Sequence, residues 1–132
     1  MLDILKKKKT VKKTEKVRFI VEEMKAAAYH SQANHGHMLR LLEAEYNAMK
    51  KNHDNAAVAL SYDTAIAAAR DSKFIHAQGL ACEKAGFYHK GMKDDQRAAK
   101  YFKQARECYE KWGSSLKVAF VKRELDALEG LH

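Results

Sequence analysis

Histidine and cysteine are the side chains of this sequence best suited to metal binding or nucleophilic chemistry. His30, His35 and His37 lie close together, but no cysteine or glutamate follows at a spacing that would complete a zinc site. Cys82 and His89 are two helical turns apart, about 10 Å along a helix, and no third group is placed to orient the histidine. We therefore predict neither a metal site nor a cysteine nucleophile.

The carboxylates offer no clear pair for acid–base catalysis. Asp63, Asp71, Asp94 and Asp95 fall at expected helix ends or exposed faces, where a carboxylate complements the helix dipole or is solvated. Paired acid–base chemistry needs two such groups in a cleft of low dielectric constant. The six glycines are isolated, and no phosphate-binding loop or Gly-x-Ser-x-Gly motif is present. The sequence predicts no enzyme activity and no cofactor.

A run of lysines near the N-terminus is the strongest remaining chemical signal. Residues 1–18 carry eight basic side chains against two acidic ones, so they account for +6 of the chain's net charge of +8. The lysines of this run are Lys6, Lys7, Lys8, Lys9, Lys12, Lys13 and Lys16. Such a run can neutralise phosphates of nucleic acid or of lipid headgroups. No aromatic side chain that would stack on a base lies within it, and a solvated tail is the simpler interpretation.

Composition indicates one all-α domain. The chain has 132 residues, 46% of them hydrophobic and 32% charged, and it contains no proline. We divide it into a basic N-terminal segment, residues 1–13, and a single helical domain, residues 14–132. No window is apolar enough to span a membrane, and the first five residues are too few for a signal-peptide core. Cys82 and Cys108 are expected to be buried or partly buried free thiols in a reducing compartment, and the protein is expected to be cytoplasmic.

Hydrophobic spacing predicts about six helices in antiparallel hairpins. They are expected near residues 14–30, 37–51, 55–71, 74–90 and 95–112, with the last beginning after Gly113–Ser115. Asp54 or Asn55, and Asp94 or Asp95, are expected N-caps, and the stretch Gly113-Ser-Ser115 is expected to end one helix and cap the last. Gly91 is expected to end its helix in the left-handed conformation. Glu45 interrupts an otherwise apolar helix face. The predicted core of the helix at 95–112 consists of Ala98, Phe102, Ala105, Tyr109 and Trp112.

An internal repeat organises these helices. When the chain is shifted by 40 residues, Tyr62 falls on Phe102, Ala65 falls on Ala105, and the polar turn 52–55 falls on 92–95. The helices at 37–51 and 55–71 then form one hairpin, and those at 74–90 and 95–112 form a second. The last helix stands where a third hairpin would begin.

The repeat resembles the tetratricopeptide family. In that family the second helix carries a small residue, an aromatic four residues later and an alanine three residues after that, as in Ala98, Phe102 and Ala105. Val58, Tyr62 and Ala65 match with one substitution, and Gly86 matches the family's glycine in the first helix. The spacing of 40 exceeds the family's usual repeat of about 34 residues. The resemblance implies a right-handed α-α superhelix.

A second resemblance covers Ala68 to Leu125, and His35 to Glu45 resembles the helix before it. This stretch is similar to the helical-repeat segment of very large signalling proteins that join kinase-like, ATPase, sensor and histidine-kinase domains. The matching features are Phe74-Ile75-His76, the pair Phe87-Tyr88, and the Tyr-x-x-Trp-Gly-x-x-x-Lys-Val pattern from Tyr109 to Val118. None of the other domains is present. The resemblance therefore implies a non-catalytic fragment of a signal-transduction kinase or ATPase.

Stacked hairpins expose a concave face lined by the first helix of each hairpin. The residues predicted to lie there are Arg40, Glu43, Asn47, Lys50, Glu83, Phe87 and Lys90. The main hypothesis is that this face binds a protein segment or couples neighbouring domains, without a small-molecule substrate. The alternative hypothesis is a nucleic-acid or anionic-membrane binder that acts through the lysine run.

Overall fold

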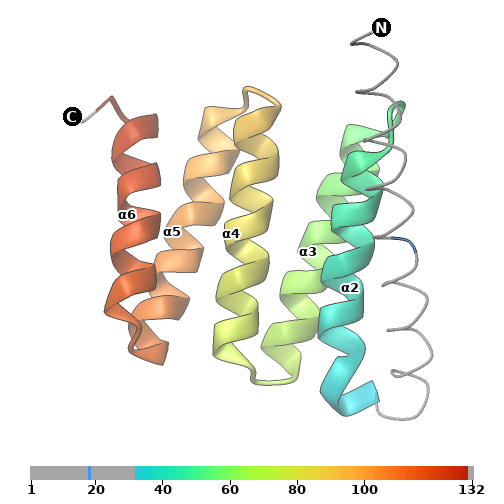
Figure 1. Cartoon of the computed structure of the whole chain (residues 1–132), viewed down its shortest axis with the longest axis horizontal. Coiled ribbons are helices and arrows are strands. Elements are labelled where there is room, and N and C mark those ends of the chain that lie inside the picture. The colour runs from blue at the N-terminus through green and yellow to red at the C-terminus, as the bar shows by residue number, and fades with distance from the viewer. Residues whose placement is uncertain (1–17, 19–31, 131–132) are drawn as a thin grey trace, which may run out of the picture.

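The computed structural model describes Arg18 and residues 32–130, and this part of the chain is all-α. Five helices follow one another in antiparallel order: α2 (Gln32–Met49), α3 (Asn55–Asp71), α4 (Ile75–Gly91), α5 (Asp95–Trp112) and α6 (Ser115–Leu128) (Figure 1). The described residues contain no strand. The predicted all-α class is thus confirmed, with five helices described where six were predicted. The predicted segment 1–13 and, apart from Arg18, the predicted helix 14–30 lie outside the described residues.

Helix α2 begins earlier than predicted. The sequence suggested a turn over residues 31–36, but the helix already includes Asn34 and Gly36. An isolated glycine costs a helix about 1 kcal/mol relative to alanine, which a continuing helix can absorb when no proline interrupts it. The next residue of the helix, His37, is buried. Its ring stacks on that of Phe74, with the two ring centroids 4.8 Å apart, and this contact anchors the first half of α2.

Three of the connections share one conformation and recur every 20 residues. Lys73, Lys93 and Gly113 have φ angles of 62°, 64° and 93°, in the left-handed region. In each connection the next N–H group donates to a carbonyl five residues earlier: Phe74 to Ala69 at 3.1 Å, Asp94 to His89 at 2.9 Å and Ser114 to Tyr109 at 3.1 Å. Helices α3 to α6 accordingly begin at residues 55, 75, 95 and 115. This pairing satisfies carbonyl groups that the end of a helix leaves open.

The helix caps are partly as predicted. Asp54, Asp94 and Ser114 accept hydrogen bonds from backbone N–H groups in the first turn of the helices that they precede, which confirms three expected N-caps. The prediction for Gly91 is wrong, because Gly91 is still part of α4 and the left-handed residue is Lys93. The turn conformation is set by the hydrogen bonds of the whole connection, so a lysine accepts it at that position.

The connection between α2 and α3 departs from this pattern. Helices α3 and α4 end at residues 71 and 91, and the same interval would end α2 at residue 51, but α2 ends two residues earlier, at Met49. His53 stands in the place of Lys73 and Lys93, yet it does not have a positive φ. The first connection is therefore longer and of a different kind from the three that follow.

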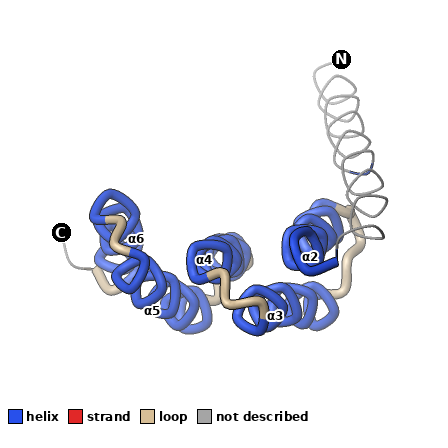
Figure 2. Tube along the Cα trace, turned by 90° about the horizontal axis from the view of Figure 1, so that it is seen from below, coloured by secondary structure: helices blue, strands red, loops and turns tan. Residues whose placement is uncertain are grey.

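The helices form two layers. Figure 2 shows α2, α4 and α6 on one side and α3 and α5 on the other. Helices α4 and α5 approach most closely where α4 carries glycine. A Cβ atom on Gly79 or on Gly86 would lie 2.7 Å from a ring atom of Tyr109 or of Phe102. The interpretation of Gly86 as a residue of close helix packing is confirmed.

The core repeats at the predicted interval of 40 residues in α3 and α5. The buried pairs are Val58 and Ala98, Tyr62 and Phe102, Ala65 and Ala105, and Ala69 and Tyr109. Trp112 is a correction, because it was predicted to be core and is 50% exposed. Helix α5 ends at this residue and Gly113 turns the chain away, so the indole lies at the rim beside His76, 5.4 Å away, with one side uncovered.

Candidate binding cleft

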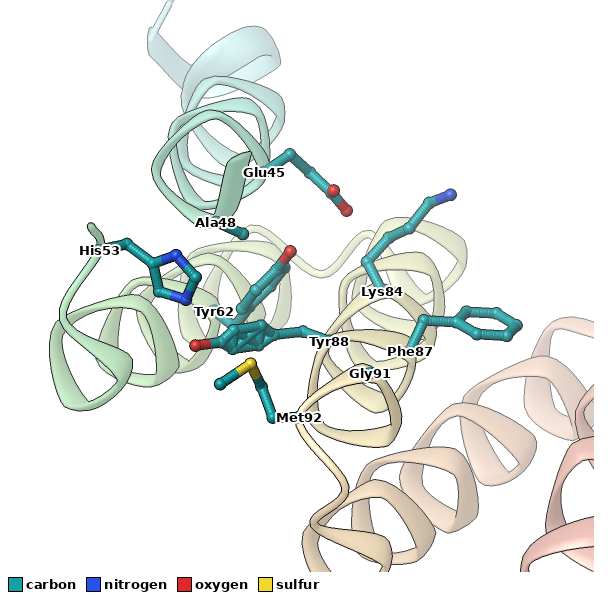
Figure 3. Close-up of a pocket in the computed structure, with 9 residues that line it drawn as sticks. All are labelled: Glu45, Ala48, His53, Tyr62, Lys84, Phe87, Tyr88, Gly91 and Met92. Carbon is teal, nitrogen blue, oxygen red and sulfur yellow. The ribbon is translucent and has the colours of Figure 1, made fainter. Parts of the chain in front are cut away.

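A cleft of about 430 Å³ opens between α2 and α4. Its lining comes from four parts of the fold: Glu45 and Ala48 of α2, His53 of the first connection, Tyr62 of α3, and Lys84, Phe87, Tyr88, Gly91 and Met92 at the end of α4 (Figure 3). Helices of the same layer form its two walls, and the layer behind them supplies its floor. Such a site is a natural place for a ligand, because a concave surface covers more of it than a flat one.

Aromatic side chains form the floor of the cleft. Tyr62 is buried within α3, and its ring centroid lies 5.5 Å from that of Tyr88. The hydroxyl of Tyr88 donates to Asn55 Oδ1 at 3.0 Å, which fixes this ring against the start of α3. The ring of His53 lies 5.8 Å from Tyr88 on the other side. Met92, which is 42% exposed, adds a flexible thioether beside them.

Glu45 is a half-buried carboxylate in the α2 wall. Burial raises its pKa, and the positive charge of Lys84 and hydrogen bonding from the Tyr62 hydroxyl oppose that rise. Its Oε1 atom is buried and has no hydrogen-bond partner within the described part of the chain. Burial also raises the pKa of Tyr62, and the Glu45 charge adds to this effect, so this hydroxyl stays protonated. Glu45 thus places a buried acceptor without a described partner in the wall of the cleft.

His53 contributes a second buried acceptor without a described partner. Its Nδ1 atom lies 2.9 Å from the carbonyl oxygen of Lys50, and since a carbonyl can only accept, Nδ1 is the donor. In a neutral imidazole the other nitrogen, Nε2, then carries the lone pair. That atom is buried and no described residue bonds to it. The irregular connection between α2 and α3 is what places this ring in the cleft.

Only one residue of the predicted binding face lines the cleft, and that residue is Phe87. Glu83 is 4% exposed and accepts hydrogen bonds from the Tyr109 hydroxyl at 2.9 Å and from Lys117 Nζ at 3.3 Å, so it binds inside the protein. Lys90 forms an ion pair with Glu124 of α6 at 2.7 Å.

The predicted residues of α2 and its end also lie outside the cleft lining: Arg40, Glu43, Asn47 and Lys50. The shift of 40 relates the buried His37 and Leu41 of α2 to the buried Ala77 and Ala81 of α4, but the four predicted residues lie on other faces of α2 and its end than the one that lines the cleft. The lining residues of α2 are Glu45 and Ala48 instead. One sequence signal pointed to Glu45, because it is an acidic residue on a helix face that was expected to be apolar.

A second hollow, of about 400 Å³, lies in the other layer between α3 and α5. Here the Tyr101 hydroxyl donates to Asp63 Oδ1 at 2.5 Å. The ring of His89 stacks parallel to Tyr101 at 5.2 Å, and burial lowers the pKa of this histidine. The exposed Leu60 forms part of the rim. The acid of this hollow is thus already bonded, unlike Oε1 of Glu45.

The described residues contain neither a metal-ligating cluster nor a membrane-spanning helix. Among them, no three histidine, cysteine, aspartate or glutamate side chains gather around a point where a metal ion would fit. None of the helices in this part of the chain combines the length and the apolar character needed to cross a bilayer. Cys82 and Cys108 are buried free thiols, as predicted, and hydrogen bonding with Cys108 together with burial raises the pKa of Cys82.

Comparison of the chain with protein-family models, with curated proteins and with solved structures gave no match in any of the three.

Proposed function

We propose that this chain is a non-catalytic helical-repeat module that binds a segment of another protein, or of a neighbouring domain, in the cleft between α2 and α4. The observation that carries this proposal is the cleft itself, which combines a tyrosine floor with two buried acceptors that nothing in the described chain satisfies. A buried polar atom without a partner is costly, and a bound segment would remove that cost.

The wider architecture in this proposal is a tetratricopeptide-like, right-handed superhelix. Two observations support this architecture. Helices α3 and α5 bury equivalent residues 40 positions apart, and successive helices alternate between two layers. The resemblance from Ala68 to Leu125 supports the further proposal that such a module belongs to a large cytoplasmic signalling kinase or ATPase. There, coupling of neighbouring domains and binding of a protein segment would use the same surface.

The test is site-directed photo-crosslinking in the native cell. Benzoylphenylalanine is introduced at Met92, which lines the cleft and is 42% exposed, and as a matched control at Leu60, which lies in the other layer and is 66% exposed. We expect one protein or domain to cross-link from position 92 and not from position 60. The purified partner should then lose at least about tenfold in affinity for the Met92→Ala variant, as a contact at the centre of an interface does. Equal cross-linking from both positions, or none from either, would overturn the proposal.

The lysine run supports a second candidate function, binding to nucleic acid or to an anionic membrane. The supporting observation is its share of the net charge, +6 of +8. Affinity for duplex DNA and for anionic vesicles is measured at two salt concentrations, with the seven lysines intact and with all seven replaced by glutamine. This function requires binding that falls steeply with salt and disappears in the variant. Binding that survives the replacement excludes it.

A further inference from the structure

We propose that the cleft between α2 and α4 selects an arginine side chain of the bound segment. The inference rests on the proposed function, because it names the chemistry that this site would recognise. Three features of the cleft carry it: two unfilled acceptors, an aromatic floor and a carboxylate whose neighbouring lysine is free to move aside.

The two buried polar atoms of the cleft that lack a described partner are both hydrogen-bond acceptors. Glu45 Oε1 belongs to a carboxylate, and His53 Nε2 carries the lone pair because Nδ1 donates to Lys50. A ligand that satisfies both must supply donors. A guanidinium has five N–H donors and no acceptor, so it fits this demand better than any other side chain. Backbone N–H groups of the same segment can serve whichever acceptor the side chain does not reach.

The floor of the cleft suits the flat face of a guanidinium. The rings of Tyr62 and Tyr88 lie 5.5 Å apart at an interplanar angle of 40°. Tyr62 is buried, so the half-buried Tyr88 is the ring that a ligand can reach, whereas Phe87 points away from both, toward Phe102 and Phe120 (Figure 3). Arginine stacks on aromatic rings and keeps its in-plane N–H groups available for acceptors. An ammonium group is a compact, strongly hydrated charge, so lysine should bind more weakly than arginine at this site.

Lys84 is the competing cation. It lines the same cleft as Glu45, and its charge favours the ionised carboxylate, yet no ion pair between the two occurs among the described residues. The Lys84 side chain is exposed and can swing into solvent when a ligand cation enters. Removing the charge of Glu45 and removing the charge of Lys84 should therefore change arginine binding in opposite directions.

The test is an NMR titration of the isotope-labelled full chain with capped single residues. The probe is N-acetyl-arginine N-methylamide, and the matched control is the citrulline compound, which has nearly the same shape but no charge. We expect the arginine probe to shift the amide signals of Glu45, His53 and Tyr88. The citrulline compound should bind at least about tenfold more weakly, because hydrogen bonds to a charged group are the stronger ones.

Three single substitutions complete the test. Glu45→Gln should abolish the preference for arginine over citrulline, and Lys84→Gln should strengthen arginine binding about threefold or more, as removal of a nearby like charge does. Asp63→Asn is the control, since it removes a carboxylate from the other hollow, and it should leave binding unchanged. The unliganded spectrum of each variant reports whether it is folded.

Each result has a definite reading. Equal shifts by both compounds at the cleft overturn the selection of arginine and leave the proposed binding module intact. A cross-linked partner at Met92 combined with no effect of the arginine probe has the same meaning, whereas absence of both removes the proposed function as well. Shifted signals of residues 6–16 in Glu45→Gln without any probe would assign the occupant to this chain's own lysines, and would overturn the proposal of a partner's arginine.

Discussion

The two junctions of helix α4 within its own layer differ in how their polar groups are used. Toward α6, Glu83 is bonded to Lys117 and to Tyr109, and Lys90 is paired with Glu124. Toward α2, the cleft contains Glu45 Oε1 and His53 Nε2, for which the described chain provides no partner. One helix therefore has a closed side and an open side.

The difference follows from the connections. The three that repeat every 20 residues set α4, α5 and α6 in matching positions, and the pairs between α4 and α6 form there. The first connection is two residues longer at the expense of α2, and it brings the imidazole of His53 toward α4. In the described chain, the regular connections accompany the junction whose polar groups are paired, and the irregular connection accompanies the junction whose polar groups are not.

The largest loss of stability should come from disturbing the close packing of α4 against α5. Phe102 is fully buried against Gly86, so Phe102→Ala should lower the free energy of unfolding by about 3–5 kcal/mol. Trp112→Ala is the matched control, and because half of Trp112 is exposed it should cost only about 1 kcal/mol. Urea denaturation followed by circular dichroism measures both. Equal losses would contradict the assignment of Trp112 to the rim.

The same substitution in the two junctions should have unequal effects. Glu83→Gln removes an ion pair and weakens a buried hydrogen bond, and should cost about 1–2 kcal/mol. Glu45→Gln removes a half-buried charge that lacks full hydrogen bonding, and should change stability by less than about 1 kcal/mol, in the stabilising direction. Chemical denaturation at pH 7 gives both values. A larger loss at Glu45 than at Glu83 would reverse the comparison.

The pH dependence of Glu45→Gln should sharpen that result. Burial raises the pKa of Glu45, so the folded state holds a proton on this carboxyl more tightly than the unfolded state does. As the pH rises from the ordinary value of 4.5 through the raised folded value, the wild type loses stability relative to the variant. The stability difference between the two should be smallest below pH 4.5 and constant above the folded pKa. A difference that shrinks with rising pH would show that this carboxyl is favoured as an anion.

The smallest change in stability should distinguish the regular connection at Lys93 from the irregular one at His53. Lys93 is held in the left-handed region, where glycine has no steric penalty, so Lys93→Gly should stabilise the fold by about 0.5–1 kcal/mol. His53→Gly should instead destabilise it, because His53 does not have a positive φ and its ring would be lost from the cleft. Thermal denaturation of the two variants compares them directly. A gain at position 53 would mean that both connections have the same backbone preference.

Local patterns predicted most of the fold. The bounds of α3 and α5, the caps at Asp54, Asp94 and Ser114, and the shift of 40 between Tyr62 and Phe102 all depend on neighbouring residues or on simple periodicity. These features are written into short stretches of sequence, so they can be recognised without knowing how the helices pack.

The candidate site was less predictable, because it depends on which side of α2 faces α4 and on an irregular connection. A constant shift assigned Glu43 and Asn47 to the binding face, but the residues of α2 that line the cleft are Glu45 and Ala48. Trp112 fails for a related reason: helical spacing puts it on the face of Tyr109, but no helix covers that end of α5. Where a helix ends, and what lies opposite, are properties of the packed molecule.

The regular connections also define how this chain can change its length. Each helix lies in the layer opposite to its neighbour, so inserting a single helix would transfer every later helix to the wrong layer. Inserting two helices would not. A tandem duplication of residues 75–114 would join Ser114 to a new Ile75 at a connection like those on either side of it. Gene duplication or engineering should therefore extend the molecule in steps of 40 residues, while the cleft beside α2 stays as it is.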